Sequence, residues 1–319
     1  MAMDRRRWLQ GVLAMTVAPV SLPAAGARTP SAPAVAGWPG PCVVPLWPDA
    51  VPGHEGYRDP PRRADEPPAF LRGIASPTLH VYRPAQPDGR AVLVCPGGAY
   101  RFVSIANEGV EVARAFNAAG ITVCVLAYRL PGEGWLQRSD VPLQDAQRAL
   151  RLIRHRAADW GVRRDAIGVM GFSAGGHLAA TLATAWDEPV YAAVDVIDEV
   201  SARPDHAALL YPVITLTTPY THAESRDQLL GVPASEALIH HRSPDEHVQP
   251  DTPRCFIAHA ADDGAVPIEN AERMTAALRR AGVGVEYHAF EHGEHAFGVG
   301  RPGTPSAAWP ALYDAWSRG

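Results

Sequence analysis

The chain of 319 residues contains no lysine, because all 29 of its basic residues are arginines. Without a lysine amine, the sequence excludes Schiff-base catalysis by lysine and every serine mechanism that uses a lysine base. The formal net charge is −5, and basic residues cluster only near the N-terminus. We therefore do not expect a nucleic acid as a partner.

Cysteine is scarce, with four residues: Cys42, Cys95, Cys124 and Cys255. Three of them lie in strand-like apolar runs, where a thiol behaves as a small buried hydrophobe. Their spacing matches no common metal-binding pattern. We expect mostly free, buried thiols and no metal site.

Long apolar runs are also rare, and none after the N-terminal region is long enough to span a membrane. Within residues 1–27, the run Arg5-Arg6-Arg7-Trp8-Leu9 resembles the twin-arginine pattern. An apolar stretch over 11–22 and small residues at 25–27 complete the features of a signal peptide with a cleavage site. The sequence predicts a periplasmic or secreted protein whose mature form does not bind a membrane.

The rest of the chain has an ordinary globular composition, with 47% hydrophobic and 20% charged residues. Residues 28–75 are rich in proline, glycine and arginine, so we expect a linker and an irregular N-terminal segment with a short strand at 42–46. Residues 76–319 form one predicted catalytic domain. Within it, the polar, proline-interrupted stretch 214–253 is predicted to be a lid or an inserted loop.

Strands alternate with helices throughout the predicted domain. Periodicity predicts strands at 76–83, 91–95, 121–128, 166–170, 207–213, 255–259 and 283–290, and helices at 108–119, 145–160, 177–182, 268–281 and 307–316. This alternation predicts the α/β class, with a mostly parallel central sheet and helices on both faces.

The pentapeptide Gly171-Phe172-Ser173-Ala174-Gly175 lies between a predicted strand and a predicted helix. A Gly-x-Ser-x-Gly motif in that context is typical of a nucleophile elbow, a tight turn that exposes the serine hydroxyl. Glycines two residues to either side allow the backbone to approach closely. The pattern predicts Ser173 as a catalytic nucleophile.

An acid and a histidine are expected in loops at the carboxyl ends of later strands, in the order serine, acid, histidine. The last two predicted strands are followed by Asp262-Asp263 and by His292 and His295. We favour Asp263, which precedes Val-Pro at the spacing common in such loops, and interpret Asp262 as a turn residue. We favour His295, which lies in a Gly-x-His-x-Phe setting, and interpret His292 as a loop residue.

The reaction of such a serine needs hydrogen-bond donors for an oxyanion. The run Pro96-Gly97-Gly98-Ala99-Tyr100 follows a predicted buried strand and consists largely of small residues. We expect the backbone N–H groups of Gly98, Ala99 and Ala174 to form the oxyanion hole. The alternative interpretation of this run is a plain tight turn.

These residues together resemble the α/β-hydrolase superfamily and, more closely, bacterial carbohydrate esterases of the acetyl xylan and feruloyl esterase type. The resemblance implies the α/β-hydrolase fold, hydrolysis of ester bonds on acylated carbohydrates by Ser173, and no cofactor. Ala99 and Ala296 depart from the glycine that many relatives have. The matching segments are 95–100 with Asn107-Glu108-Gly109, 127–131, 142–149, 171–177, 201–205, Tyr211-Pro212, and the loops of Asp263 and His295.

The leading hypothesis is an exported serine esterase that removes acetyl or feruloyl groups from plant polysaccharides or oligosaccharides. A general carboxylesterase for small esters is the first alternative. A prolyl-peptidase-like hydrolase is a weaker one, because no N-terminal region of β-propeller length precedes the domain. A catalytically inactive binding protein is disfavoured because every expected catalytic residue is present.

Overall fold

The computed structural model describes residues 35–61 and 66–319, and the predicted signal peptide lies outside the described residues. The strands are β1 (Cys42–Pro45), β2 (Phe70–Leu71), β3 (Thr78–Tyr82), β4 (Ala91–Cys95), β5 (Val103–Ser104), β6 (Thr122–Ala127), β7 (Ile167–Phe172), β8 (His206–Leu210), β9 (Arg254–Ala260) and β10 (Val285–Phe290). The α-helices are α1 (Glu111–Ala118), α2 (Val141–His155), α3 (Ala174–Thr184), α4 (Ala223–Leu230), α5 (Glu236–His241), α6 (Glu269–Arg280) and α7 (Trp309–Ser317).

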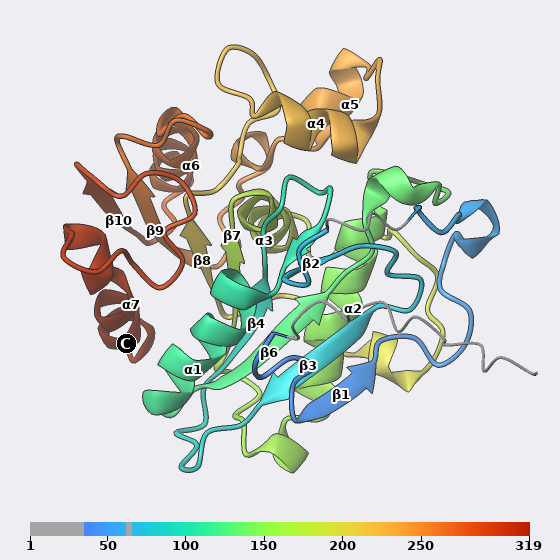
Figure 1. Cartoon of the computed structure of the whole chain (residues 1–319), viewed down its shortest axis with the longest axis horizontal. Coiled ribbons are helices and arrows are strands. Elements are labelled where there is room, and N and C mark those ends of the chain that lie inside the picture. Colours follow the sequence, from blue (N-terminus) through green and yellow to red (C-terminus); the bar gives the residue numbers. More distant parts are fainter. Residues whose placement is uncertain (1–34, 62–65) are drawn as a thin grey trace, which may run out of the picture. The chain divides into compact units, whose positions relative to one another are not determined.

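Eight of the described strands form one sheet in the order β1-β3-β6-β4-β7-β8-β9-β10 (Figure 1). The six strands from β6 to β10 in this order pair in parallel, whereas β3 is antiparallel to both β1 and β6. The prediction of a mostly parallel sheet is therefore confirmed. β2 and β5 form a separate two-stranded ribbon.

Side chains of the central strands alternate between two buried layers, one on each face of the sheet. Leu93 and Val169 belong to the layer that also contains residues of α2, α3 and α6. Val92 and Met170, their neighbours in the chain, belong to the layer that contains residues of α1 and α7. Each fully buried side chain of this size contributes about 1.5–3 kcal/mol relative to an exposed one. The predicted helices on both faces are confirmed.

The chain changes direction across the sheet at β4. β4 lies between β6 and β7 in the sheet. The connection through α1 leads from β4 to β6 on one side, whereas β7, the strand that precedes Ser173, lies on the other side of β4. In an open α/β sheet, such a switch point leaves a crevice at the carboxyl ends of the strands. A Cβ on Gly97 would lie 2.9 Å from Cβ of Ser173. The loop after β4 therefore packs directly against the turn after β7.

The described part of the N-terminal segment, which was predicted to consist of a linker and irregular structure, packs against the sheet domain. β1 confirms the short strand predicted there, and it pairs with β3 as an edge strand. Leu46 and Trp47 are buried in the same core layer as α2 and α3. The indole Nε1 of Trp47 donates a hydrogen bond to Asp145 Oδ1 at 2.9 Å. These apolar residues occur without periodicity, which is why the sequence pattern did not predict their burial.

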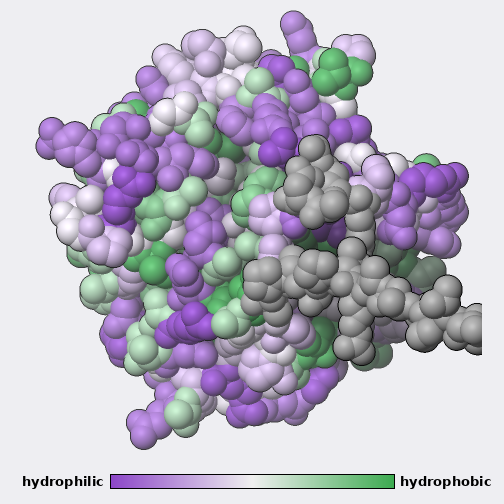
Figure 2. All heavy atoms as spheres, viewed as in Figure 1, coloured by the Kyte–Doolittle hydropathy of each residue, from purple (hydrophilic) through white to green (hydrophobic). Residues whose placement is uncertain are grey.

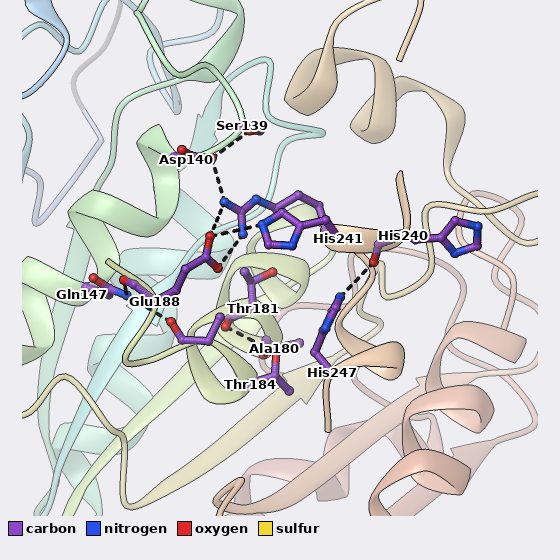
Figure 3. Close-up of polar contacts among 12 residues, drawn as sticks. Ser139, Asp140, Gln147, Ala180, Thr181, Thr184, Glu188, His240, His241 and His247 are labelled. Atoms are coloured by element: carbon purple, nitrogen blue, oxygen red, sulfur yellow. Dashed lines mark hydrogen bonds and ion pairs between the residues drawn. The ribbon is translucent and has the colours of Figure 1, made fainter. Parts of the chain in front are cut away.

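The stretch 214–253 contains α4 and α5, which lie beyond the ends to which β7 and β8 point (Figure 1). Arg242, just after α5, is almost fully buried and forms ion pairs with Asp140 at 2.7 Å and Glu188 at 2.8 Å. Figure 3 shows both acids, with His241 beside Glu188. These ion pairs attach the stretch to the start of α2 and to the segment after α3. Its action as a lid stays a prediction.

All four cysteines are free, and all but Cys42 are buried. Burial raises the pKa of Cys255 to about 12, because the apolar surroundings disfavour the thiolate. The prediction of mostly free, buried thiols is confirmed.

Hydrophilic residues predominate on the face shown in Figure 2, with hydrophobic ones scattered among them. The large hydrophobic residues exposed in the described parts of the chain are Val43, Leu136, Val194, Val196 and Val232. None of the helices in residues 35–61 and 66–319 combines the length and the apolar character needed to cross a membrane.

Candidate active site

Ser173 occupies a sharp turn between β7 and α3, with backbone angles φ +54° and ψ −121°. Positive φ costs a non-glycine residue about 1–2 kcal/mol, so the surrounding contacts must hold the turn in place. The Ser173 N–H donates to the carbonyl of Leu210 at 3.1 Å. A Cβ on Gly171 would collide with the carbonyl of Gly175, which explains the glycines of the motif. The local geometry is that of a nucleophile elbow.

The structure brings together the three side chains that the sequence analysis favoured. His295 Nε2 lies 2.9 Å from Ser173 Oγ, and His295 Nδ1 lies 2.7 Å from Asp263 Oδ2. The Asp263 side chain is 1% exposed, whereas that of His295 is 24% exposed. With Nδ1–H donated to the carboxylate, Nε2 is free to accept the serine proton. This arrangement can activate the hydroxyl as a nucleophile.

Asp263 accepts more hydrogen bonds than the one from His295. Its Oδ1 accepts the backbone N–H groups of Ala265 and Val266, each at 2.9 Å. Its Oδ2 also lies 3.1 Å from Nε2 of His259, a fully buried side chain on β9. Burial alone raises the pKa of Asp263, but the bonds from His259 and His295 hold it well below its usual range. The carboxylate therefore stays charged.

His259 was not singled out from the sequence. The available signal was its position at the end of a predicted strand, four residues before Asp263. Histidine is common enough in strands that this position alone does not indicate a role.

The two alternatives, Asp262 and His292, lie together but outside the serine–histidine contact. Asp262 Oδ1 accepts the N–H groups of Gly293 at 2.9 Å and Glu294 at 2.7 Å. His292 Nδ1 lies 3.3 Å from Asp262 Oδ2, and its side chain is 67% exposed. Asp262 thus tethers the loop that carries His295.

The expected oxyanion donors lie around Ser173. Gly98 and Ala99 line the same cavity as Ser173 and His295, and both have positive φ, +129° and +54°. Ala174 is the first residue of α3, so its N–H has no acceptor within the helix and lies at the positive end of the helix dipole. The role of these three N–H groups as oxyanion donors stays a prediction.

The loop of Gly98 and Ala99 is tied to the stretch 214–253 through His177. The Tyr100 hydroxyl lies 2.8 Å from His177 Nδ1, and His177 Nε2 lies 2.7 Å from the carbonyl of Arg242. A carbonyl can only accept, so Nε2 carries the hydrogen and Nδ1 accepts from Tyr100. Burial lowers the pKa of His177 to about 4. This neutral histidine of α3 is buried between the two segments that it connects.

A cavity of about 470 Å³ opens beside Ser173 and His295. One wall is the stacked pair Phe70 and Phe102, with ring centroids 4.0 Å apart. Glu224 of α4 also lines it and forms an ion pair with Arg101 at 3.1 Å. The wall of this cavity therefore comes from three separate segments of the chain, around Phe70, around Phe102 and at α4. Among the residues that the structure describes, no group of three or more His, Cys, Asp or Glu side chains is arranged to hold a metal ion.

One family model and several curated proteins match this chain. The BD-FAE family model matches residues 79–278. Endo-1,4-beta-xylanase B of Butyrivibrio fibrisolvens is 34% identical over 72% of this chain and 34% of its own length. Acetylxylan esterase of Xylanibacter ruminicola is 31% identical over 69% of this chain and 43% of its own length. The chain thus matches less than half of each of these two curated relatives.

Solved structures give matches over more of the chain. The acetyl ester-xyloside bifunctional hydrolase of Caldicellulosiruptor lactoaceticus superposes with a TM-score of 0.73 at 31% identity, covering 91% of this chain and 98% of that one. A carboxylesterase of Lactobacillus plantarum superposes with a TM-score of 0.63 at 25% identity, covering 78% of this chain and 95% of that one.

Proposed function

Since the chain belongs to the BD-FAE family and has the α/β-hydrolase fold, we propose that it is a serine carboxylic-ester hydrolase whose nucleophile is Ser173. The observation that carries this proposal is the pair of contacts made by His295, 2.9 Å to Ser173 Oγ and 2.7 Å to Asp263 Oδ2. These distances lie within hydrogen-bond reach, as proton transfer between the hydroxyl and the imidazole requires.

In the acylation step, Ser173 Oγ forms a bond to the ester carbonyl carbon while His295 Nε2 takes the hydroxyl proton. The carbonyl electron pair moves onto oxygen, and the N–H groups of Gly98, Ala99 and Ala174 stabilise the resulting oxyanion. Removing one such donor costs about 3 kcal/mol in enzymes that have an oxyanion hole. The alcohol leaves with the proton from His295, and the acyl group remains on Ser173.

In the deacylation step, water attacks the acyl-enzyme while His295 takes its proton. Collapse of the second tetrahedral intermediate releases the carboxylic acid and returns the proton to Ser173. Asp263 keeps the imidazole in the required tautomer and stabilises the imidazolium that forms in both steps. Its buried position and its low pKa suit that role.

For the substrate, we propose acetyl or feruloyl esters on plant polysaccharides or oligosaccharides. The names of the acetylxylan esterase and acetyl ester-xyloside hydrolase relatives support this class. The aromatic wall of Phe70 and Phe102 also suits a sugar ring or an aromatic acyl group, since both pack well on aromatic faces. A general carboxylesterase is the second candidate, because the same three side chains would act on any small ester that fits the cavity.

For localisation, we propose export by the twin-arginine route. The pair Arg5-Arg6 followed by Trp8 and Leu9 supports it. Replacing both arginines with lysine is expected to keep the protein in the cytoplasmic fraction of an expressing bacterium. Equal amounts of wild type and variant in the periplasmic fraction would contradict export by this route.

The test of the activity is a pre-steady-state measurement with p-nitrophenyl acetate. We expect a burst of p-nitrophenol close to one equivalent, absent in Ser173→Ala. A burst that survives in Ser173→Ala would rule out Ser173 as the nucleophile. Acetylated xylan, an alkyl feruloyl ester and an aminoacyl-proline amide are then compared by kcat/KM. A preference for the amide would overturn the esterase assignment.

A further inference from the structure

Glu108 is a buried carboxylic acid beside the active site, 3% exposed, with no part in the mechanism above. It lies in a π-helical turn, Ala106–Val110, that leads directly into α1. Such turns insert an extra residue into a helix and often occur at functional sites. In the sequence, this residue belongs to the segment Asn107-Glu108-Gly109 and begins the helix predicted over 108–119.

One oxygen of Glu108 holds the oxyanion loop. Oε2 accepts the backbone N–H of Gly97 at 2.7 Å. Gly97 directly precedes the expected donors Gly98 and Ala99. Because a Cβ on Gly97 would lie 3.0 Å from Oε2 and 2.9 Å from Cβ of Ser173, the loop is wedged between the carboxylate and the nucleophile.

The other oxygen of Glu108 connects to the loop that carries His295. Oε1 accepts the Tyr211 hydroxyl at 2.9 Å, and the Tyr211 oxygen accepts the N–H of Gly298 at 3.1 Å. The Tyr211 ring also packs edge-on against the His295 ring, with centroids 5.1 Å apart. A single carboxylate therefore binds the oxyanion loop directly at Gly97 and reaches the loop of His295 through the Tyr211 hydroxyl.

Both hydrogen bonds require Glu108 to supply two acceptor oxygens. Gly97 N–H and the Tyr211 hydroxyl both donate, so both oxygens of Glu108 act as acceptors. An amide of the same shape has only one acceptor atom. Burial raises the pKa of Glu108, whereas the bonds from Gly97 and Tyr211 and the nearby His295 act in the opposite direction.

We propose that Glu108 is a positioning residue that sets the spacing between the oxyanion loop, 96–100, and the histidine loop, 291–298. The inference rests on the roles proposed above for Ser173 and His295. The oxyanion and the imidazolium form in the same step, so the donors and the base must be placed together. A misplacement of about 1 Å can cost about 10²-fold in rate.

The primary test is Glu108→Gln, which keeps the shape and removes one acceptor. We expect kcat for p-nitrophenyl acetate to fall about 10- to 100-fold, with a much smaller change in KM, because both oxygens of Glu108 are engaged by Gly97 and Tyr211 although the residue lines the cavity. Rates are expressed per active site, titrated with the burst, so that unfolded protein does not enter the comparison.

Tyr211→Phe is the second variant, and it removes only the hydroxyl between Glu108 and Gly298. Tyr211→Phe should lower kcat as Glu108→Gln does. The kcat of the double variant should lie within a factor of about two of the lower of the two single-variant values, because the effects of coupled sites are not additive. Full multiplication of the two losses would overturn the link between the loops.

Glu133→Gln is the matched control. Glu133 is also a buried glutamate that accepts a glycine N–H, that of Gly73 at 2.9 Å, but it does not line the cavity. We expect a similar loss of stability and an unchanged kcat. Wild-type kcat in Glu108→Gln or in Tyr211→Phe would overturn the inference. Ser173→Ala separates the two proposals, because an active Ser173→Ala would refute the proposed nucleophile instead.

Discussion

Arg129 and Asp145 form an ion pair in which neither side chain is exposed to solvent. The guanidinium donates to both carboxylate oxygens, with Nη2 at 2.8 Å from Oδ1 and Nε at 2.9 Å from Oδ2. The remaining Arg129 nitrogen donates to the carbonyl of Pro52 at 2.6 Å, and Trp47 donates to Asp145. The pair thus joins the end of β6, helix α2 and the N-terminal segment at one buried point.

Asp145→Asn is expected to reduce the free energy of unfolding by about 3–5 kcal/mol, because it leaves the buried Arg129 charge without its partner. Urea unfolding measures the change. The control is Asp159→Asn, which removes the partner of Arg156 in an ion pair with side chains 42% and 59% exposed. Exposed pairs contribute about 0–1 kcal/mol. Equal losses in the two variants would contradict the structural role of the buried pair.

Asp263→Asn is expected to lower kcat by about 10⁴-fold, the loss seen when the acid of such a triad becomes an amide and the histidine adopts the wrong tautomer. Asp262→Asn should change kcat only by a small factor, because its amide oxygen can still accept the N–H groups of Gly293 and Glu294. Steady-state kinetics with p-nitrophenyl acetate makes the comparison. The assignment of the acid is wrong if Asp262→Asn is the more damaging change.

His206 is expected to make stability depend on pH in the acidic range. Burial, helped by the charges of Arg254 and Arg90, lowers its pKa to about 4 from about 6.5 in the unfolded chain. Between these values the unfolded state binds a proton that the folded state does not. Stability is therefore lost as pH falls from about 6.5 to 4, by about 1.4 kcal/mol per pH unit. His80 and His177 act in the same direction.

The measurement for His206 is the free energy of unfolding in urea at several pH values between 7 and 4.5. His206→Gln lacks the titrating group, so its stability should fall less steeply on acidification than that of the wild type. The two curves should converge as pH falls. Parallel curves would show that His206 does not titrate between the two states.

Arg242→Met is expected to loosen the stretch 214–253, because the ion pairs to Asp140 and Glu188 attach it to the domain. Hydrogen exchange in α5 should become faster than in the wild type, measured by mass spectrometry of its peptides. Arg226→Met is the control, since the ion pair of Arg226 within the described residues is with its chain neighbour Asp227. Unchanged exchange in Arg242→Met would show that other contacts hold the stretch.

The strands were predicted well because buried parallel strands leave continuous apolar runs. The run at 91–95 coincides with β4, and 283–290 contains β10. The helix predicted over 108–119 is instead a π-helical turn followed by α1, Glu111–Ala118. A hydrophobic period of 3.6 residues does not reveal one extra residue in the first turn, the turn in which Glu108 is buried.

Ser173, Asp263 and His295 are predictable from short local motifs and from loop positions after strands, and the structure brings them into contact. The contacts of Glu108, His259 and Arg129 were not predictable in the same way. Glu108 depends on a partner far away in the chain, Tyr211, 103 residues later. His259 contacts Asp263 only four residues on, but a histidine at a strand end does not by itself indicate that contact. Polar residues carry no periodicity that would indicate such a partner.

By itself, the sequence determined the class of the fold, the order of strands and helices and the turn that exposes Ser173, because these depend on local propensity and on apolar periodicity. Only the tertiary structure decided which loops meet, which acid faces His295 and how Glu108 joins the two loops. Those contacts arise where the sheet reverses its order at β4. They depend on how distant segments pack together, and no local sequence pattern predicts that packing.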